Sequence, residues 1–225
     1  MKSARDFSIR LDHLVVCASG LSDGVTWFQE LSGVQMPFGG KHPLMGTHNH
    51  LSALSEDSFI EIIAIDPEAG KTALPERGQR WYTMDDASHQ QRVAVAPRLT
   101  TWVLATDNLD AALAKAREAG IDPGEPLDVT RGDLSWRLSV RSDGSLACGG
   151  VFPSLIEWTD HVNPVVRMQD QGIRLNQLNL QHTSPQLLKK ALQAIGAAEL
   201  VSVSEGEPAL VADLRAGEHN FTLYS

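Results

Sequence analysis

The sequence of 225 residues lacks the features that mark several classes of protein. Its two cysteines, Cys17 and Cys148, are too few for a disulfide framework and are not spaced for a zinc knuckle. We therefore expect a reducing compartment and interpret Cys17 as a buried thiol. No apolar run is long enough to span a bilayer, and the charged start "MKSARDFSIR" lacks the apolar stretch of a signal peptide. The expected location is cytoplasmic.

Basic residues are also scarce, since 19 Lys and Arg stand against 28 Asp and Glu, a net charge of -9. Without a basic run or a basic stripe interleaved with aromatics, neither nucleic acid nor an anionic membrane is an expected partner. The hydrophobic content of 42% is sufficient for one or two globular domains with a sizeable core. A small-molecule substrate or ligand remains as the expected partner.

One pattern occurs twice in the chain. "LDHLVV" at 11–16 is followed by "FIEIIAI" at 59–65, and "TTWVLA" at 100–105 is followed by "SLIEWTD" at 154–160. Each half thus carries a strand with a polar residue and, about fifty residues later, a strand with a glutamate. This layout is typical of a ligand cavity built from two copies of one unit.

The periodicity predicts an α+β fold of repeated βαβββ modules. The first module covers 1–66 and the second 99–165, and together they form a curved sheet that encloses a cavity. Residues 67–98 contain prolines and polar material, which predicts a linker or lid with short helices around "RGQRWYTM" and "DDASHQQ". A third βαβββ-like module covers 172–225. It either packs against the first two modules or pairs with its counterpart in a homodimer.

Individual elements of the first module follow from local signals. Residues 9–17 predict a strand, and "LSDGVTWFQELSG" predicts a helix with Ser22 or Asp23 as its N-cap and Gly33 as its end. Three more strands are expected near 34–38, 47–54 and 58–65.

Alternate residues of a strand share a face, so His13 is expected to lie with Val15 and Cys17, and also with Leu11. The same count places Glu61 and Glu157 among apolar neighbours. An unpaired polar group in such surroundings costs roughly 2 to 7 kcal/mol, and a charge costs more. A metal ion, an arginine or a proton must therefore compensate each carboxylate.

With these residues the chain resembles the vicinal oxygen chelate superfamily, which includes glyoxalase I, extradiol dioxygenases and bleomycin-resistance proteins. The closer resemblance is to its glyoxalase-like domain family, over about residues 9–160. The resemblance implies a divalent metal held by first- and fourth-strand residues of both modules: His13, Glu61, the residue at 102 and Glu157. Position 102 is tryptophan, which cannot ligate a metal. His13, Glu61 and Glu157 could still hold Mn, Fe, Ni or Zn.

The glycine-rich segment from Phe38 to Asn49 contributes further candidates. His48 and His50 share a strand face and could chelate a metal, although solvated loop histidines are the more frequent case. The resemblance places this segment at the cavity entrance, where His42 and His48 would contact substrate or transfer protons. The candidate catalytic residues are Glu157, Glu61 and His42. The candidate substrate-binding residues are Trp102, Phe59, His48, Asn49, Arg131 and Trp136.

Three hypotheses compete at this stage. The first is a divalent-metal-dependent enzyme of lyase, isomerase or dioxygenase type acting on a small oxygenated metabolite. The second is a metal-free protein that binds or sequesters a small molecule, with Trp102 as a stacking surface. In that case Glu61 and Glu157 would be hydrogen-bonded or paired to Arg137 or Arg131. The third is a structural subunit whose third module drives oligomerisation and in which Glu61 and Glu157 are paired to arginines in a closed core.

Overall fold

A computed structural model describes residues 6–69 and 78–225. Twelve strands and four helices lie within these residues. In chain order they are β1 (Ile9–Cys17), α1 (Leu21–Ser32), β2 (Phe38–His42), β3 (Thr47–Ala53), β4 (Phe59–Ile65), α2 (Ala87–Val95), β5 (Arg98–Thr106), α3 (Leu109–Glu118), β6 (Glu125–Arg131), β7 (Leu134–Val140), β8 (Ser154–Trp158), β9 (Ile173–His182), α4 (Pro185–Ile195), β10 (Ser202–Glu205), β11 (Ala209–Ala216) and β12 (His219–Tyr224).

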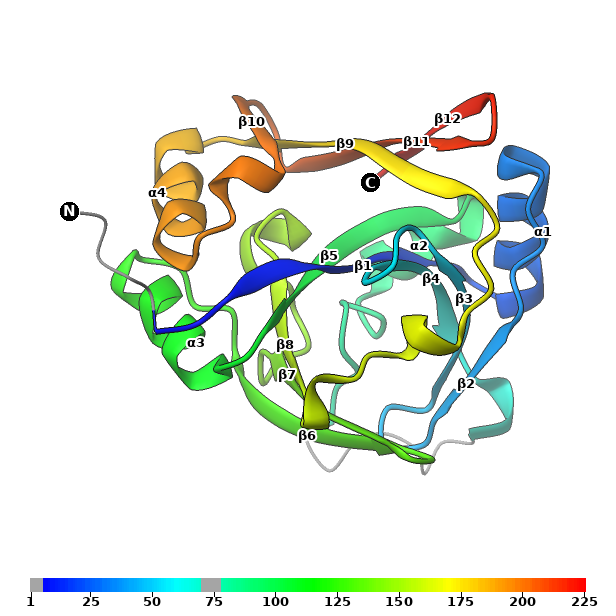
Figure 1. Cartoon of the computed structure of the whole chain (residues 1–225), viewed down its shortest axis with the longest axis horizontal. Coiled ribbons are helices and arrows are strands. Elements are labelled where there is room, and N and C mark those ends of the chain that lie inside the picture. Colours follow the sequence, from blue (N-terminus) through cyan, green and yellow to red (C-terminus); the bar gives the residue numbers. More distant parts are fainter. Residues whose placement is uncertain (1–5, 70–77) are drawn as a thin grey trace.

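The first eight strands form one curved sheet in the order β2-β3-β4-β1-β5-β8-β7-β6. In each half the first strand pairs in parallel with the fourth, β1 with β4 and β5 with β8, and the antiparallel pair β1 and β5 joins the halves. The sheet curls until its two edge strands, β2 and β6, come together (Figure 1). The expected α+β fold with two cavity-enclosing βαβββ modules is confirmed.

Local signals place most of these elements where the sequence predicts them. Gly33 ends α1 in the left-handed conformation, and Asn108 caps α3 by accepting a hydrogen bond from the backbone of Ala111. Two expectations are wrong. The helix α1 begins at Leu21 with Gly20 as an N-cap that makes no side-chain bond, and the strand expected near 34–38 is β2, which starts only at Phe38 because it pairs with β3.

A β-bulge in β1 decides the direction of its side chains. In the pairing with β5, Leu11 lies opposite Leu104 and His13 lies opposite Val103, so Asp12 is the extra residue. As a result, Leu11 packs against the outer core while Val15 and Cys17 belong to the inner one. The expectation that Leu11 shares a face with His13 is therefore wrong.

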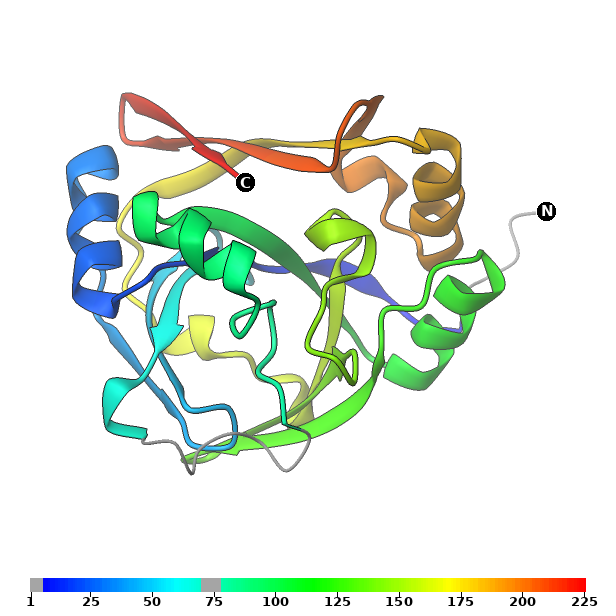
Figure 2. The ribbon, with the colours of Figure 1, turned by 180° about the vertical axis from the view of Figure 1, so that it is seen from behind.

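The C-terminal strands form a second sheet in the order β10-β9-β11-β12. Its element order, β-α-β-β-β, repeats that of the other modules, but the first strand pairs in parallel with the second strand and not with the fourth. This sheet packs over the outer face of the large sheet, and both contribute to one apolar core that contains Trp102, Phe28 and Phe221 (Figures 1 and 2). The third module thus packs on the first two within the same chain.

Residues 78–97 of the insert between the modules pack against the inner side of the large sheet. The predicted helix around "DDASHQQ" is α2, whose N-cap Asp86 accepts a hydrogen bond from the backbone of His89. Around "RGQRWYTM", the described residues from 78 onward form turns, with Tyr82 and Thr83 at positive φ; residue 77 lies outside the described residues. Trp81 and Tyr82 are buried against the inner core.

No helix within residues 6–69 and 78–225 has the length and apolar character needed to cross a membrane. The two cysteines are unpaired, and burial raises the pKa of the Cys17 thiol to about 12. A thiol with this pKa is not a nucleophile at neutral pH, so the interpretation of Cys17 as a buried structural thiol holds.

Candidate functional site

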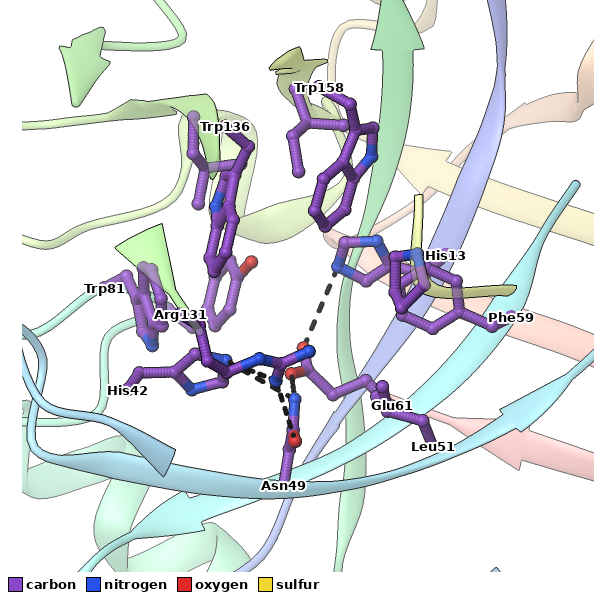
Figure 3. A pocket seen from close by; sticks show the side chains of 14 residues that line it. His13, His42, Asn49, Leu51, Phe59, Glu61, Trp81, Arg131, Trp136 and Trp158 are labelled. Atoms are coloured by element: carbon purple, nitrogen blue, oxygen red, sulfur yellow. Dashed lines mark hydrogen bonds and ion pairs between the residues drawn. The ribbon is translucent and has the colours of Figure 1, made fainter. Parts of the chain in front are cut away.

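A pocket opens inside the curved sheet, between the two modules (Figure 3). Every strand of the sheet except β5 supplies part of its wall, and the insert and the segment after β8 complete it. Its lining residues are His13, His42, Asn49, Leu51, Phe59, Glu61, Trp81, Tyr82, Arg131, Trp136, Leu138, Ile156, Trp158 and Pro164.

His13 lies between two carboxylates at the centre of the pocket. Its Nδ1 is 2.7 Å from Oδ1 of Asp12, and its Nε2 is 3.7 Å from Oε2 of Glu61. Asp12 is fully buried and also accepts hydrogen bonds from the indole of Trp158 (2.8 Å) and the amide of Asn163 (3.3 Å). The bulge makes this array possible, because it turns two consecutive residues of β1 into the interior.

Glu61 is held in place by Asn49, whose amide donates to Oε1 at 2.5 Å. Arg131 extends from the end of β6 across the junction of the two sheet edges and donates to Oδ1 of Asn49 at 3.3 Å. Burial lowers the pKa of Arg131, and the charge of Glu61 opposes that effect. The pocket therefore contains a buried carboxylate with a guanidinium nearby that stabilises negative charge (Figure 3).

His42 is a neutral member of the site. It is 4% exposed, and burial, followed by the charge of Arg131, lowers its pKa to about 3. Arg131 donates to its Nε2 at 3.1 Å, so the proton of the neutral ring is on Nδ1, which donates to Oγ1 of Thr47 at 3.1 Å. The sequence suggested that His42 contacts substrate or transfers protons; in the structure its Nε2 accepts a hydrogen bond from Arg131.

The buried neutral form of His42 predicts a pH dependence of stability. Below pH 6.5 the unfolded chain protonates this residue while the folded chain does not, until the pH reaches about 3. The free energy of unfolding should therefore fall on acidification through that window, by up to about 1.4 kcal/mol per pH unit for this group. Denaturant melts of the wild type and His42→Gln between pH 7 and 4 should show a shallower slope in the variant. Equal slopes would contradict this account.

Aromatic rings line most of the remaining wall. The His13 ring stacks on Phe59 with ring centroids 4.6 Å apart, Trp136 packs against Trp158 at 5.1 Å, and the guanidinium of Arg131 lies 6.0 Å from the centroid of Trp136. Because these rings fill the interior, the free cavity in this conformation measures only about 30 Å³, room for one or two water molecules.

Two glycines of β2 make room for the polar residues of the site. A Cβ on Gly39 would lie 2.4 Å from Oδ1 of Asn49 and 2.7 Å from Cγ of Leu51, and one on Gly40 would lie 3.0 Å from Cδ of Arg131. These glycines allow side chains of the site itself to lie against β2.

Gly39→Ala should therefore destabilise the protein by roughly 1 to 3 kcal/mol and displace Asn49 from Glu61. Gly217→Ala is a suitable control, because nothing lies within 4 Å of a Cβ there and only the strain of φ +58 is added. Thermal melts and the NMR signal of the Asn49 side-chain amide would measure both effects. An unmoved Asn49 amide signal in Gly39→Ala would show that the strand yields elsewhere.

The structure brings together most of the site residues that the sequence predicts: His13, Glu61, His42, Asn49, Phe59, Arg131 and Trp136. It does not bring Glu157, Trp102 or His48 to the pocket. Glu157 accepts hydrogen bonds from Arg137 (3.3 Å) and from the backbone of Leu109 at the start of α3, on the outer face.

Trp102 is fully buried in the outer core, where its indole donates to the carbonyl of Val151 at 2.9 Å. His48 points away from the pocket toward Asp66, since Thr47, Asn49 and Leu51 take the inner face of β3. The sequence prediction missed Asp12, Trp81 and Trp158. Asp12 was missed because regular alternation directs it away from His13, and a bulge has no signal in this stretch of sequence.

The metal site implied by the family resemblance does not fit the residues that meet here. Of the expected ligands only His13 and Glu61 face one another, and the second module places Ile156 and Trp158 where further ligands would be needed. Within residues 6–69 and 78–225, no cluster of three or more His, Cys, Asp or Glu side chains could hold an ion. Arg131 already supplies the positive charge near Glu61.

The sheet of two βαβββ halves around a polar pocket defines a protein of the vicinal oxygen chelate type. Residues 11–196 match the model of the glyoxalase-like domain family, and the chain belongs to that family. No curated protein matches the sequence.

Several solved structures are similar to this chain at low sequence identity. A hypothetical protein from Staphylococcus aureus is 15% identical with a TM-score of 0.60, covering 96% of this chain and 85% of that one. Methylmalonyl-CoA epimerase from Mycobacterium tuberculosis is 16% identical with a TM-score of 0.40, covering 66% and 85%. A variant of the Streptomyces coelicolor epimerase, in complex with 2-nitronate-propionyl-CoA, is 16% identical with a TM-score of 0.42, covering 69% and 98%.

Proposed function

We propose that this chain is an enzyme of lyase or isomerase type that moves a proton on a small carboxylate- or carbonyl-bearing metabolite. The observation that supports this most is the array Asp12, His13 and Glu61, buried in one pocket with Arg131 nearby. An acid and a base that face a common space, with a cation for the charge that develops, are the parts that proton transfer beside a carbonyl requires.

In this proposal each residue has one task. The carboxylate of Glu61 removes a proton from carbon, and Asn49 keeps that carboxylate oriented. Arg131 stabilises the oxyanion of the resulting enolate. His13 returns a proton from Nε2, the nitrogen that faces Glu61, and Asp12 fixes the ring and balances its charge while it carries the proton.

A divalent metal is not needed for these steps. The family resemblance implies one, but His13 and Glu61 alone give two ligands, whereas stable protein sites usually use three or four. A dioxygenase would need a redox metal held in this way, so the lyase or isomerase alternative is favoured. We expect the activity to persist after treatment with a chelator, and loss of activity on chelation with recovery on adding a transition metal would overturn the metal-free form of the proposal.

Exchange of substrate hydrogen in D2O tests the proton transfer even when the product is unidentified. A panel of 2-oxo, 2-hydroxy and 2-methyl carboxylic acids and their thioesters is incubated with the enzyme, and loss of the C–H signal is followed by proton NMR. His13→Gln should abolish the exchange, whereas His48→Gln, on the outer face of β3, should retain it. Absence of exchange for the whole panel, or equal exchange in both variants, would count against the proposal.

A metal-free binding protein is the second candidate. The aromatic walls, Trp81, Trp136 and Trp158 with Phe59, could hold a flat ligand by stacking without any reaction. In that case ligands would quench tryptophan fluorescence, His13→Gln would leave affinity almost unchanged, and no hydrogen exchange would occur.

A further inference from the structure

A second cavity lies at the end of the curved sheet where β1 begins and β5 ends. Its volume is about 340 Å³, within the usual range for sites that hold small molecules. The cavity is separate from the pocket described above, although Trp158 lines both. Its lining residues are Ser8, Arg10, Ala105, Thr106, Asp107, Trp158 and His161.

Arg10 is the unusual member of this cavity. It lies opposite Ala105 in the pairing of β1 with β5, and it is partly buried. Its Nη1 is shielded from solvent and has no hydrogen-bond partner, and within residues 6–69 and 78–225 the guanidinium forms no ion pair. A guanidinium nitrogen that is shielded from solvent and lacks a hydrogen-bond partner costs free energy, so Arg10 would gain from an anion that pairs with its guanidinium.

The other polar residues of this cavity form no hydrogen bond or ion pair with the guanidinium of Arg10. The Oδ1 of Asp107 accepts a hydrogen bond from the backbone of Ser8 at 2.8 Å, and that bond lowers the pKa of Asp107. Asp107 thus stays ionised but is committed to the backbone at the start of β1. His161 reaches the cavity from a turn in which Asp160 and His161 both have positive φ, at 59° and 58°. Non-glycine residues pay for this conformation, and such strain is concentrated at functional sites.

We propose that this cavity binds an anionic oxygen group, a carboxylate or a phosphate, through Arg10, with any apolar part of the ligand against Trp158. A guanidinium presents parallel N–H donors that match the two oxygens of either group. The proposal does not rest on proton transfer in the first pocket. It adds a second site that would recognise small anions.

Titration calorimetry with benzoate and with inorganic phosphate, at constant ionic strength, tests this assignment. The wild type should bind at least one of them, and Arg10→Met should bind it about 10- to 100-fold more weakly, since a charge-assisted hydrogen bond is lost. Arg10→Lys should retain part of the affinity. Arg131→Met, which removes the arginine of the first pocket, should leave it unchanged.

The two anions separate the possible sources of the oxygen group. Binding of benzoate alone would identify an organic acid with an apolar part, and binding of phosphate alone would identify a phosphate group. Binding of neither to the wild type, or equal binding by Arg10→Met, would overturn the proposal. Loss in Arg131→Met but not in Arg10→Met would instead place the anion in the first pocket and would overturn it as well.

Two further measurements distinguish the loss of the anion site from misfolding of the Arg10→Met variant. Because Nη1 of Arg10 has no partner among the residues that the structure describes, Arg10→Met should melt at the same temperature as the wild type or higher, and only the wild type should gain stability on adding the anion. In the wild type itself, the indole N–H signal of Trp158, assigned with Trp158→Phe, should shift during the titration. An unmoved signal at saturation would place the ligand elsewhere and would overturn the assignment.

Discussion

Glu61→Gln is expected to reduce the rate of hydrogen exchange by about 10²- to 10⁴-fold, the usual contribution of a positioned general base. The substitution keeps the volume and the hydrogen-bonding capacity of the side chain while it removes the group that accepts the proton. The amide of Asn49, which donates to Oε1 of Glu61 at 2.5 Å, can still donate to the oxygen of a glutamine. Folding should therefore be preserved, and the loss should appear in the chemical step.

Glu157→Gln provides the matched control. The sequence predicted both glutamates as metal ligands or catalytic residues, but only Glu61 lines the pocket. Glu157 accepts from Arg137 and from the start of α3, and its side chain is 25% exposed. Its replacement should cost no more than about 1 kcal/mol of stability, as for most surface ion pairs, and should leave the exchange rate unchanged. A larger loss of activity from Glu157→Gln than from Glu61→Gln would reverse the assignment of the site.

Asp12→Asn is expected to lower the exchange rate by about 10²- to 10⁴-fold without removing any group that contacts substrate. Asp12 accepts from His13, Trp158 and Asn163, and an asparagine has only one oxygen with which to accept. If that oxygen stays with Trp158 and Asn163, its NH₂ group faces Nδ1 of His13. The ring must then carry its proton on Nε2, and no carboxylate remains to balance a charged ring.

A direct readout separates this positioning role from a structural one. Nitrogen NMR of the His13 ring should show the proton move from Nδ1 to Nε2 in Asp12→Asn, together with the loss of rate. Loss of the buried hydrogen bonds of Asp12 should also lower the free energy of unfolding by about 1 to 3 kcal/mol, which denaturant melts would measure. Asp110→Asn, an exposed carboxylate paired with Arg137, serves as the control and should change neither the His13 signal nor the rate. An unchanged tautomer in Asp12→Asn would remove Asp12 from the mechanism.

The position of the ring proton also decides the role that we assign to His42. Because Arg131 donates to its Nε2 and burial keeps its pKa at about 3, His42 holds Arg131 in position and does not itself carry protons at neutral pH. Substitution of His42 should therefore slow hydrogen exchange, because Arg131, to which we assign stabilisation of the enolate oxyanion, would lose the group that holds it. In the proposed mechanism, His13 transfers protons and His42 positions Arg131.

The sequence by itself determined the two βαβββ modules and the presence of His13 and Glu61 on two of their strands. These follow from local periodicity, from helix-ending glycines such as Gly33, and from apolar runs long enough for buried strands. The match over residues 11–196 confirms the family that those features indicated.

The tertiary structure decided which side chains meet. Strand alternation correctly places Glu157 on the opposite face of β8 from Ile156 and Trp158. Because β8 is buried on both faces, the sequence does not show which face is the inner one. The packing of Glu157 against α3 shows that Ile156 and Trp158 point into the pocket. The bulge that joins Asp12 to His13 depends on pairing with β5. Arg131 reaches Asn49 and His42 only because the sheet curls until β6 meets β2, a closure set by the whole fold and not by any segment of the sequence.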